Sequence, residues 1–168
     1  LMLDPTMAYS SAWYADPDAG LHEAQVAKFD RLIELLDITE DDHVLEIGTG
    51  WGGLAVHIAE TVGAPVTTTT ISREQFDLAR KRVAEAGVSD RVTVLDVDYR
   101  DLTGTFDRVV SVEMIEAVDH RDHAAYFDVL ARRLRPGGHA VLQAIVIDDA
   151  AYERAKRQQD FIKRAVFP

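Results

Sequence analysis

A glycine-rich turn that follows an acidic residue is the part of the sequence best suited to hold a ligand. Glu46 is followed by Gly48, Gly50, Gly52 and Gly53. Glycine has no Cβ, so the backbone of such a turn can approach a ligand more closely than other residues allow. The spacing departs from the dinucleotide fingerprint G-x-G-x-x-G, although Gly53 restores that match. The turn therefore indicates a ligand without identifying it, and a tight turn with no ligand stays an alternative.

Two further polar segments separate the ligand classes. A dinucleotide site usually has an acidic residue after its second strand to bind the ribose hydroxyls, whereas this sequence has four threonines at 67–70. Glu46 with x-Gly-x-Gly is instead typical of the pocket for S-adenosylmethionine (SAM) in methyltransferases. Asp98 and Tyr99 follow a third apolar run, where a carboxylate commonly meets the adenine amine and an aromatic ring covers the base, although a polar loop explains them equally well. Together these segments favour SAM over a nicotinamide cofactor.

The order of apolar and amphipathic segments predicts the elements that must position these residues. Apolar residues recur at helical spacing over 23–36, and short apolar runs then alternate with amphipathic ones. We expect strands at 43–48, 65–71, 91–95, 106–112 and 140–147. We expect further helices at 52–62, after an N-cap at Ser72 with Gln75 in a capping box, and at 121–134, ending at Pro136-Gly137-Gly138.

This alternation predicts the class of fold. Strands that are separated by helices pair in parallel through crossover connections. The chain is therefore expected to form a doubly wound α/β domain, with a mainly parallel sheet and helices on both faces. Ligands bind such sheets at the carboxyl ends of the strands, near the first strand. We expect residues 23–168 to form this single domain and residues 1–22 to form a segment that closes over the ligand.

Composition excludes several functions. The 168 residues carry a net charge of −11, which argues against nucleic acid as a partner because such binding depends on clusters of Lys and Arg. Cysteine is absent, so disulfides and thiolate metal sites are excluded. No run of about 18 apolar residues is present to span a bilayer, and we expect a cytoplasmic domain. His120 and His123 lie beside Asp119 and Asp122 without an evident third ligand, so we predict no metal site.

Several motifs, in this order and spacing, carry a resemblance to one family. They are Asp4–Tyr14, Leu45–Gly53, Thr70–Gln75, Asp98–Asp101, Ser111–Glu116 and Ile162–Pro168. With them the sequence resembles the cyclopropane and mycolic-acid methyltransferase family over nearly its whole length. The resemblance implies the class I, Rossmann-like methyltransferase fold. Members continue beyond the Phe-Pro at which this chain ends, so a C-terminal part that completes the lipid pocket and carries a catalytic tyrosine is expected to be missing.

The resemblance also implies a set of residues that bind SAM. They are Tyr9 and Ser10 at the methionine end, Glu46, Gly48 and Gly50 in the turn, Thr70, Ile71 and Gln75 around the ribose, and Tyr99 and Arg100 beside the adenine. Gln75 would then take the place of the acidic residue that is missing after the second strand.

The chemistry implied by the resemblance is attack of an alkene on the electrophilic methyl group of SAM, which leaves a cation on the acyl chain. Glu116 would stabilise that cation. In cyclopropane-forming relatives a bicarbonate ion accepts the proton, held by a cysteine, the equivalent glutamate and a histidine. Here Ser11 replaces the cysteine and Gln143 replaces the histidine, and both can still donate hydrogen bonds to an anion. Ile145 completes this catalytic set, and Glu113 is interpreted as a solvated or structural carboxylate.

The departures from the ring-forming pattern favour a particular product. Tyr-Ser-Ser-Ala-Trp at 9–13, Glu-Met-Ile-Glu-Ala at 113–117 and Leu-Gln-Ala-Ile at 142–145 are similar to the branch that makes tuberculostearic acid precursors. That branch converts an oleoyl chain into a 10-methylene-stearoyl chain, which a separate reductase then saturates. A cyclopropane product is the first alternative, and a non-catalytic SAM- or lipid-binding domain is the second.

The expected partner is an unsaturated fatty-acyl phospholipid, reached from the cytoplasm at the inner face of the membrane. Basic residues between Arg154 and Arg164 are compatible with contact to anionic lipid, although a solvated helix is the simpler interpretation. The sequence leaves a homo-oligomer open.

Overall fold

The computed structural model describes residues 3–157 and shows alternating helices and strands. Segment 162–168, which carries part of the family resemblance, lies outside the described residues. The helices are α1 Leu21–Leu36, α2 Gly53–Thr61, α3 Arg73–Glu85, α4 His123–Arg133 and α5 Asp149–Arg157, with short 3-10 turns at Tyr99–Asp101 and Ile115–Ala117. The strands are β1 Val44–Ile47, β2 Val66–Thr70, β3 Val92–Asp96, β4 Phe106–Val112 and β5 Leu134–Gln143. Among residues 3–157, no helix combines the length and the apolar character that crossing a membrane requires.

The strands form one five-stranded sheet in the order β3-β2-β1-β4-β5, and every neighbouring pair is parallel. The chain first winds from β1 outward to β3 and then returns to the other side of β1 with β4. This arrangement confirms the doubly wound α/β prediction. The reversal of strand order between β1 and β4 lies at the carboxyl ends of both strands, where such sheets bind ligands.

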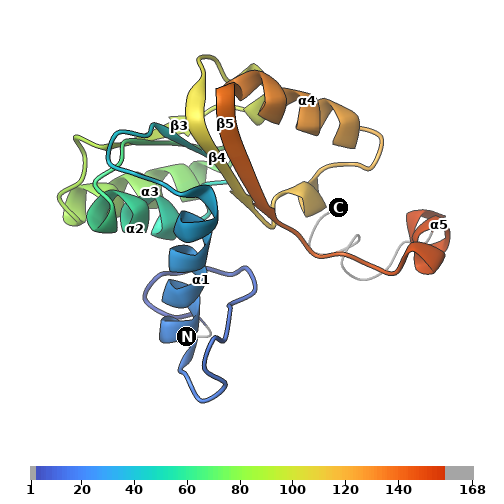
Figure 1. Ribbon diagram of the computed structural model, residues 1–168, viewed down its shortest axis with the longest axis horizontal. Coiled ribbons are helices and arrows are strands. Elements are labelled where there is room, and N and C mark those ends of the chain that lie inside the picture. The colour runs from blue at the N-terminus through green and yellow to red at the C-terminus, as the bar shows by residue number, and fades with distance from the viewer. Residues whose placement is uncertain (1–2, 158–168) are drawn as a thin grey trace.

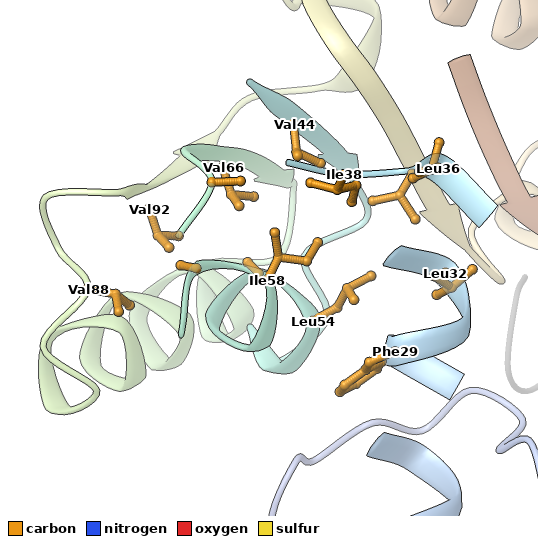
Figure 2. Close-up of a cluster of buried hydrophobic side chains, with 14 of the residues drawn as sticks. Phe29, Leu32, Leu36, Ile38, Val44, Leu54, Ile58, Val66, Val88 and Val92 are labelled. Carbon is orange, nitrogen blue, oxygen red and sulfur yellow. The ribbon is translucent and has the colours of Figure 1, made fainter. Parts of the chain in front are cut away.

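Two apolar clusters cover the two faces of the sheet. On one face, side chains of α1, α2 and α3 pack on alternate positions of the strands, including Val44, Val66 and Val110. Figure 2 shows Phe29 and Leu32 of α1 facing the helix α2 that carries Leu54 and Ile58. On the other face, Tyr126, Val129 and Leu130 of α4 pack against Leu45, Ile47 and Val109. The period-2 alternation of the strands therefore supplies both cores.

The last strand differs from its predicted bounds. A strand was expected at 140–147 after a break at Pro136-Gly137-Gly138, but β5 begins at Leu134 and ends at Gln143. Pairing with β4 is irregular where the break was expected, because the register shifts between Phe106 and Arg108 and Gly137 takes a φ of +82°. β5 lies at the edge of the sheet among the described strands, where a proline removes no hydrogen bond from an inner ladder.

The end of helix α1 is fixed by an arginine of β4. Asp37 ends the helix in the left-handed conformation, with a φ of +50°. Arg108 donates from Nε to the carbonyl oxygen of Leu36 at 2.7 Å and from Nη2 to that of Asp37 at 3.3 Å. Its Nη1 also lies 3.3 Å from Oδ1 of Asp42. These bonds occupy carbonyl groups that a helix end leaves free.

Candidate active site

A cavity of about 300 Å³ opens at the carboxyl end of the sheet, where the strand order reverses. Its lining combines the glycine turn, the ends of β2, β3 and β4, and one aromatic residue of the N-terminal segment. Residues predicted from the sequence that line it are Tyr9, Gly48, Gly50, Thr70, Ile71, Gln75, Tyr99 and Arg100. The cavity thus brings together predicted residues that are up to 91 positions apart, as between Tyr9 and Arg100.

The glycine turn approaches the cavity with its backbone. Gly48 has a φ of +100° and Gly50 a φ of +51°, conformations that residues with a Cβ rarely adopt. A Cβ on Gly48 would lie 3.2 Å from the side chain of Met114, and one on Gly50 would lie 3.5 Å from the ring of Tyr9. Glycine at these two positions therefore allows the tight turn and leaves its backbone exposed to the cavity.

Glu46 is buried beneath this turn. Its side chain is 3% exposed and accepts a hydrogen bond from Oγ1 of Thr68 at 2.6 Å. Burial raises the pKa of Glu46 to about 8, because removing the carboxylate from water disfavours its charged form. Glu46 lines a smaller cavity of about 50 Å³ between the turn and residues 6–10, which Ser10 also lines. Glu46 and Ser10 therefore do not line the cavity of about 300 Å³, but the two cavities adjoin, since Gly48 and Gly50 line both.

The end of β2 forms a polar wall. Ser72 caps α3 by accepting from the backbone nitrogen of Gln75 at 3.3 Å, as predicted. The side chain of Gln75 does not complete the capping box. It accepts from Oγ1 of Thr70 at 2.7 Å and donates to the hydroxyl of Tyr9 at 3.2 Å. Ile71, which is 75% exposed, stands beside this chain of hydrogen bonds at the rim of the cavity.

An aromatic side chain and an ion pair form the opposite wall. Tyr99 is 9% exposed and packs edge to face on Tyr126, with ring centroids 5.4 Å apart. Asp98 and Arg100 form a bidentate pair, with Nη2 of Arg100 2.6 Å from Oδ2 of Asp98. The hydrogen bonds from Arg100 hold the pKa of Asp98 below its usual range. Asp98 thus lines the cavity as a carboxylate whose two oxygens both accept from Arg100.

These features fit SAM. A Cβ-free turn, an amide and hydroxyl wall, and an aromatic wall with a charged carboxylate suit a ligand that has an amino-acid end, a ribose and a base. Tyr9, Gly48 and Gly50 would hold the amino-acid end, Thr70 and Gln75 the ribose, and Asp98 and Tyr99 the base.

A second group of polar side chains gathers around Glu113, directly after β4. Oε1 of Glu113 accepts from the backbone nitrogen of Ser11 at 2.8 Å and from Nε2 of Gln143 at 2.8 Å. The same Nε2 also donates to the carbonyl oxygen of Ser11 at 3.1 Å. Glu113 has a φ of +46°, a strained conformation for a glutamate. Of the two interpretations of Glu113 made from the sequence, solvated or structural, the second fits these contacts, since Glu113 is the shared acceptor of this group.

Glu116 lies in a separate contact with the segment after β5. Its Oε1 accepts from the backbone nitrogen of Ile145 at 2.6 Å, while its Oε2 is buried and has no hydrogen-bond partner. Glu116 is not among the residues that line the main cavity, although its neighbour Ala117 is. The four residues expected to form one catalytic group therefore divide into Ser11 with Gln143 and Glu116 with Ile145.

The histidines considered for a metal have other contacts. His120 pairs with Asp119 at 3.2 Å, and Nε2 of His123 lies 3.2 Å from the carbonyl oxygen of Val118. No group of three His, Asp or Glu side chains is arranged to hold a metal ion within residues 3–157.

The role of Glu113 could have been inferred from one signal in the sequence. Val112 pairs with Gln143, so Glu113 and Gln143 stand at the carboxyl ends of neighbouring parallel strands. Residues at such ends lie close together at one edge of a sheet. The contact with Ser11 gave no such signal, because it joins residues 102 positions apart through an irregular segment.

Comparison with known proteins agrees with this geometry. The whole chain, residues 1–168, matches the family described as mycolic acid cyclopropane synthetase. It is 43% identical to tuberculostearic acid methyltransferase UfaA1 of Mycobacterium tuberculosis over 173 residues, which cover 99% of this chain and 40% of that protein. It is also 43% identical to the cyclopropane-fatty-acyl-phospholipid synthase of Escherichia coli over 144 residues, covering 86% of this chain and 36% of that protein.

A solved structure shares the fold over almost the whole chain. The mycolic acid cyclopropane synthase CmaA1, complexed with SAH and CTAB, superposes with a TM-score of 0.89 at 28% identity, covering 99% of this chain and 61% of that one. The chain thus spans about 40% of the length of the curated relatives that it matches. Two relatives of at least 30% identity and a family match over every residue lead to one conclusion. The chain belongs to the mycolic acid cyclopropane synthetase family.

Proposed function

We propose that this chain is the cofactor-binding core of a SAM-dependent methyltransferase that acts on the double bond of an unsaturated fatty-acyl phospholipid and forms a 10-methylene-stearoyl chain. SAM as the cofactor is supported by the fit of the cavity and by the SAH-bound structure of a family member. Relatives named for tuberculostearic acid and for cyclopropane formation are equally similar, at 43% identity each, so identity alone does not choose the product.

The observation that carries the proposal is the position of the Glu113 carboxylate. The shell expected to hold bicarbonate in ring-forming relatives includes the residues equivalent to Ser11 and Gln143. In this chain the Ser11 backbone N–H and the Gln143 side-chain amide both donate to Glu113. A carboxylate of the protein therefore occupies donors that an external anion would need. Glu113, rather than bicarbonate, is the proton acceptor in the proposed reaction.

The mechanism follows from this placement. When bound, SAM would supply an electrophilic methyl group to the alkene. The carbon–sulfur bond of that methyl group would break, its electron pair would stay on sulfur, and S-adenosylhomocysteine would be the leaving group. The new carbon–carbon bond uses the π electrons and leaves a cation on the neighbouring acyl carbon, and a hydride shift moves that cation to the carbon that bears the new methyl group. Glu113 then accepts a proton from the methyl group, and the C–H electron pair becomes the exocyclic double bond. In a cyclopropane synthase the same electron pair would instead close a ring.

Glu116 is proposed to stabilise the cation. A buried carboxylate oxygen with no hydrogen-bond partner interacts strongly with a nearby positive charge, because little water screens it. The bond from Ile145 fixes the other oxygen and so orients the group.

Further parts of the proposal concern the surroundings of the enzyme. The substrate is reached at the inner face of the membrane from the cytoplasm, and a separate reductase saturates the methylene group. Neither step depends on self-association, and a homo-oligomer is compatible with both.

The test uses purified protein, dioleoyl phosphatidylglycerol vesicles and SAM labelled with ¹³C in its methyl group, in buffer depleted of carbon dioxide and again with added bicarbonate. We expect ¹³C-coupled vinylidene protons in the released fatty acid, with a rate that bicarbonate does not change. Cyclopropyl protons would identify ring closure and contradict the proposed product. SAM binding without any labelled lipid would support a non-catalytic domain instead.

A further inference from the structure

Residues 9–11 run beside the cofactor cavity, which Tyr9 and Glu113 both line, and helix α1 holds them through two side chains. Gln25 donates from Nε2 to the carbonyl oxygen of Ser10 at 2.9 Å. Lys28, one helical turn later, donates from Nζ to Oγ of Ser10 at 2.7 Å. The adjacent Ser11 is held by Glu113 and Gln143 from the ends of the strands. The segment that contacts the cofactor cavity is therefore clamped between α1 and the group around Glu113.

Lys28 is an unusual residue for its position. It lies on the face of α1 that packs into the core, beside Ala24 and Leu32, and is only 2% exposed. An apolar side chain would fill this position without the free-energy cost of burying an ammonium group. Burial lowers the pKa of Lys28 to about 8, while the carboxylates of Glu113 and Asp4 favour its charged form. The one hydrogen bond described for its Nζ is the one to Oγ of Ser10.

We propose that Lys28 is a positioning residue with two roles. Its ammonium fixes Ser10, and through Ser10 the segment that places Tyr9 against the cofactor cavity. Through the adjacent Ser11, whose backbone N–H donates to Glu113, the same contact also orients that carboxylate. The first role concerns SAM binding alone, whereas the second rests on the proposed function, in which Glu113 accepts the proton.

The two roles predict separate changes in Lys28→Met, which keeps an unbranched side chain but removes the charge and the donor. The dissociation constant for SAM should rise about tenfold, since a hydrogen bond from a charged donor is lost. At saturating SAM, kcat should fall by a further factor of about ten, because the Ser11 donor that orients Glu113 is no longer held in place. Lys28→Arg, which retains the charge, should recover most of kcat.

The experiment measures SAM affinity by isothermal titration calorimetry without lipid, and kcat with vesicles of dioleoyl phosphatidylglycerol. It compares wild type, Lys28→Met, Lys28→Arg, Ser10→Ala and the double variant Lys28→Met/Ser10→Ala. Lys81→Met is the control, since Lys81 is 67% exposed on α3 and pairs only with Glu85 in the described contacts. Because Lys28 acts through the Ser10 hydroxyl, the double variant should bind SAM no more weakly than Lys28→Met.

Other outcomes would overturn the proposal. A lower melting temperature for Lys28→Met, with SAM affinity and kcat both within twofold of wild type, would reduce Lys28 to a structural residue. Fully additive effects of the two substitutions would also contradict an action through Ser10. If Lys28→Met does not fold, Ser10→Ala tests the same contact, because it removes the hydroxyl that accepts from Lys28. Unchanged SAM affinity in Ser10→Ala would contradict the proposed role of that contact. A cyclopropane product would overturn the proposed function but leave the SAM measurements, made without lipid, as a separate test of Lys28.

Discussion

The side-chain nitrogen of Gln143 lies 2.8 Å from Oε1 of Glu113 and donates a hydrogen bond to it. Because Ser11 donates to the same oxygen, two N–H groups fix one oxygen of the carboxylate and leave the other without a partner in the described contacts. These two uncharged N–H donors orient the carboxylate but form no ion pair with it. The relationship leads to the first two predictions.

Glu113→Gln should lower kcat at least about 100-fold, because the amide cannot accept the proton. SAM affinity should change by less than about threefold, since Glu113 contacts the N-terminal segment and the amide oxygen still accepts from Ser11. Glu60→Gln, an exposed position of α2, serves as the control. Steady-state kinetics measures kcat, and isothermal titration calorimetry measures the affinity for SAM. If Glu116→Gln abolished turnover while Glu113→Gln did not, Glu116 would be the base.

Glu113→Gly should be rescued in part by bicarbonate. Glycine adopts the φ of +46° without strain and removes the carboxylate, so the donors of Ser11 and Gln143 become free for an anion. We expect a rate that rises with bicarbonate concentration in this variant and stays constant in wild type. Chloride at equal ionic strength is the control. If bicarbonate did not activate Glu113→Gly at any concentration, Glu113 would have a structural role and would not be the base.

Glu46→Gln should change how stability depends on pH. The pKa of Glu46 is raised by burial to about 8, so the folded protein binds a proton that the unfolded chain releases near pH 4.5. The wild type therefore loses stability as pH rises from about 4.5 to 8, on the order of a few kcal/mol. Glutamine lacks this titration, so the melting temperature of the variant relative to wild type should increase between pH 5 and pH 8.5. A difference that stays constant over that range would mean that Glu46 is ionised when buried.

Gly53→Ala should disturb the N-terminal segment. A Cβ at this position would lie 2.6 Å from the carbonyl oxygen of Thr6, which must move away. We expect weaker SAM binding by calorimetry, although alanine favours the helix that begins there. Gly87→Ala is the control, since its φ of +73° imposes strain but its Cβ would meet no atom within 4 Å. That control should lower stability by about 1 kcal/mol and leave SAM affinity unchanged.

Arg108→Met should destabilise the fold by about 2 kcal/mol, because the last carbonyl groups of α1 lose charged donors in a largely buried position. The melting temperature should fall by roughly 4–8 °C. Arg132→Met removes an exposed pair with Asp128 and should cost less than about 1 kcal/mol. SAM affinity should be unaffected in both. Equal effects of the two substitutions would mean that the cap contributes no more than a surface pair.

The sequence predicted the fold because local signals agreed with it. Apolar periodicity identified each strand, and Ser72 and the glycine turn marked the starts of helices α3 and α2. The start of β5 was missed because Pro136 and Gly137 indicate a break, whereas an edge strand tolerates both at an irregular pair. The place of the cavity followed from the rule that ligands bind at the strand ends, whereas Tyr9, Gln75 and Arg100 in its lining were implied by the family resemblance.

The division of the catalytic residues could not be predicted in the same way. Ser11 contacts Gln143 across 132 positions, and which of two nearby glutamates accepts from them depends on the backbone at Glu113. A φ of +46° turns Glu113 toward Ser11, and no residue type in the sequence signals that conformation. The burial of Lys28 could not be predicted either, because a lysine within a helical pattern is ordinarily placed on the solvated face.

Four consecutive threonines restrict the register in which β2 can pair with its neighbouring strands. Thr67 lies 2.9 Å from Nε2 of His43, Thr68 donates to Glu46, Thr69 donates to the carbonyl oxygen of Val97, and Thr70 donates to Gln75. A slip of one residue against β1 would exchange the faces of all four and leave hydroxyl groups in apolar surroundings. A strand of uniform β-branched residues could otherwise pair in more than one register, but here hydroxyl partners from the β1, β3 and α3 regions fit a single alignment. The hydroxyl groups of Thr67, Thr68 and Thr69 thus find their partners only when β2 lies between β1 and β3 in this register.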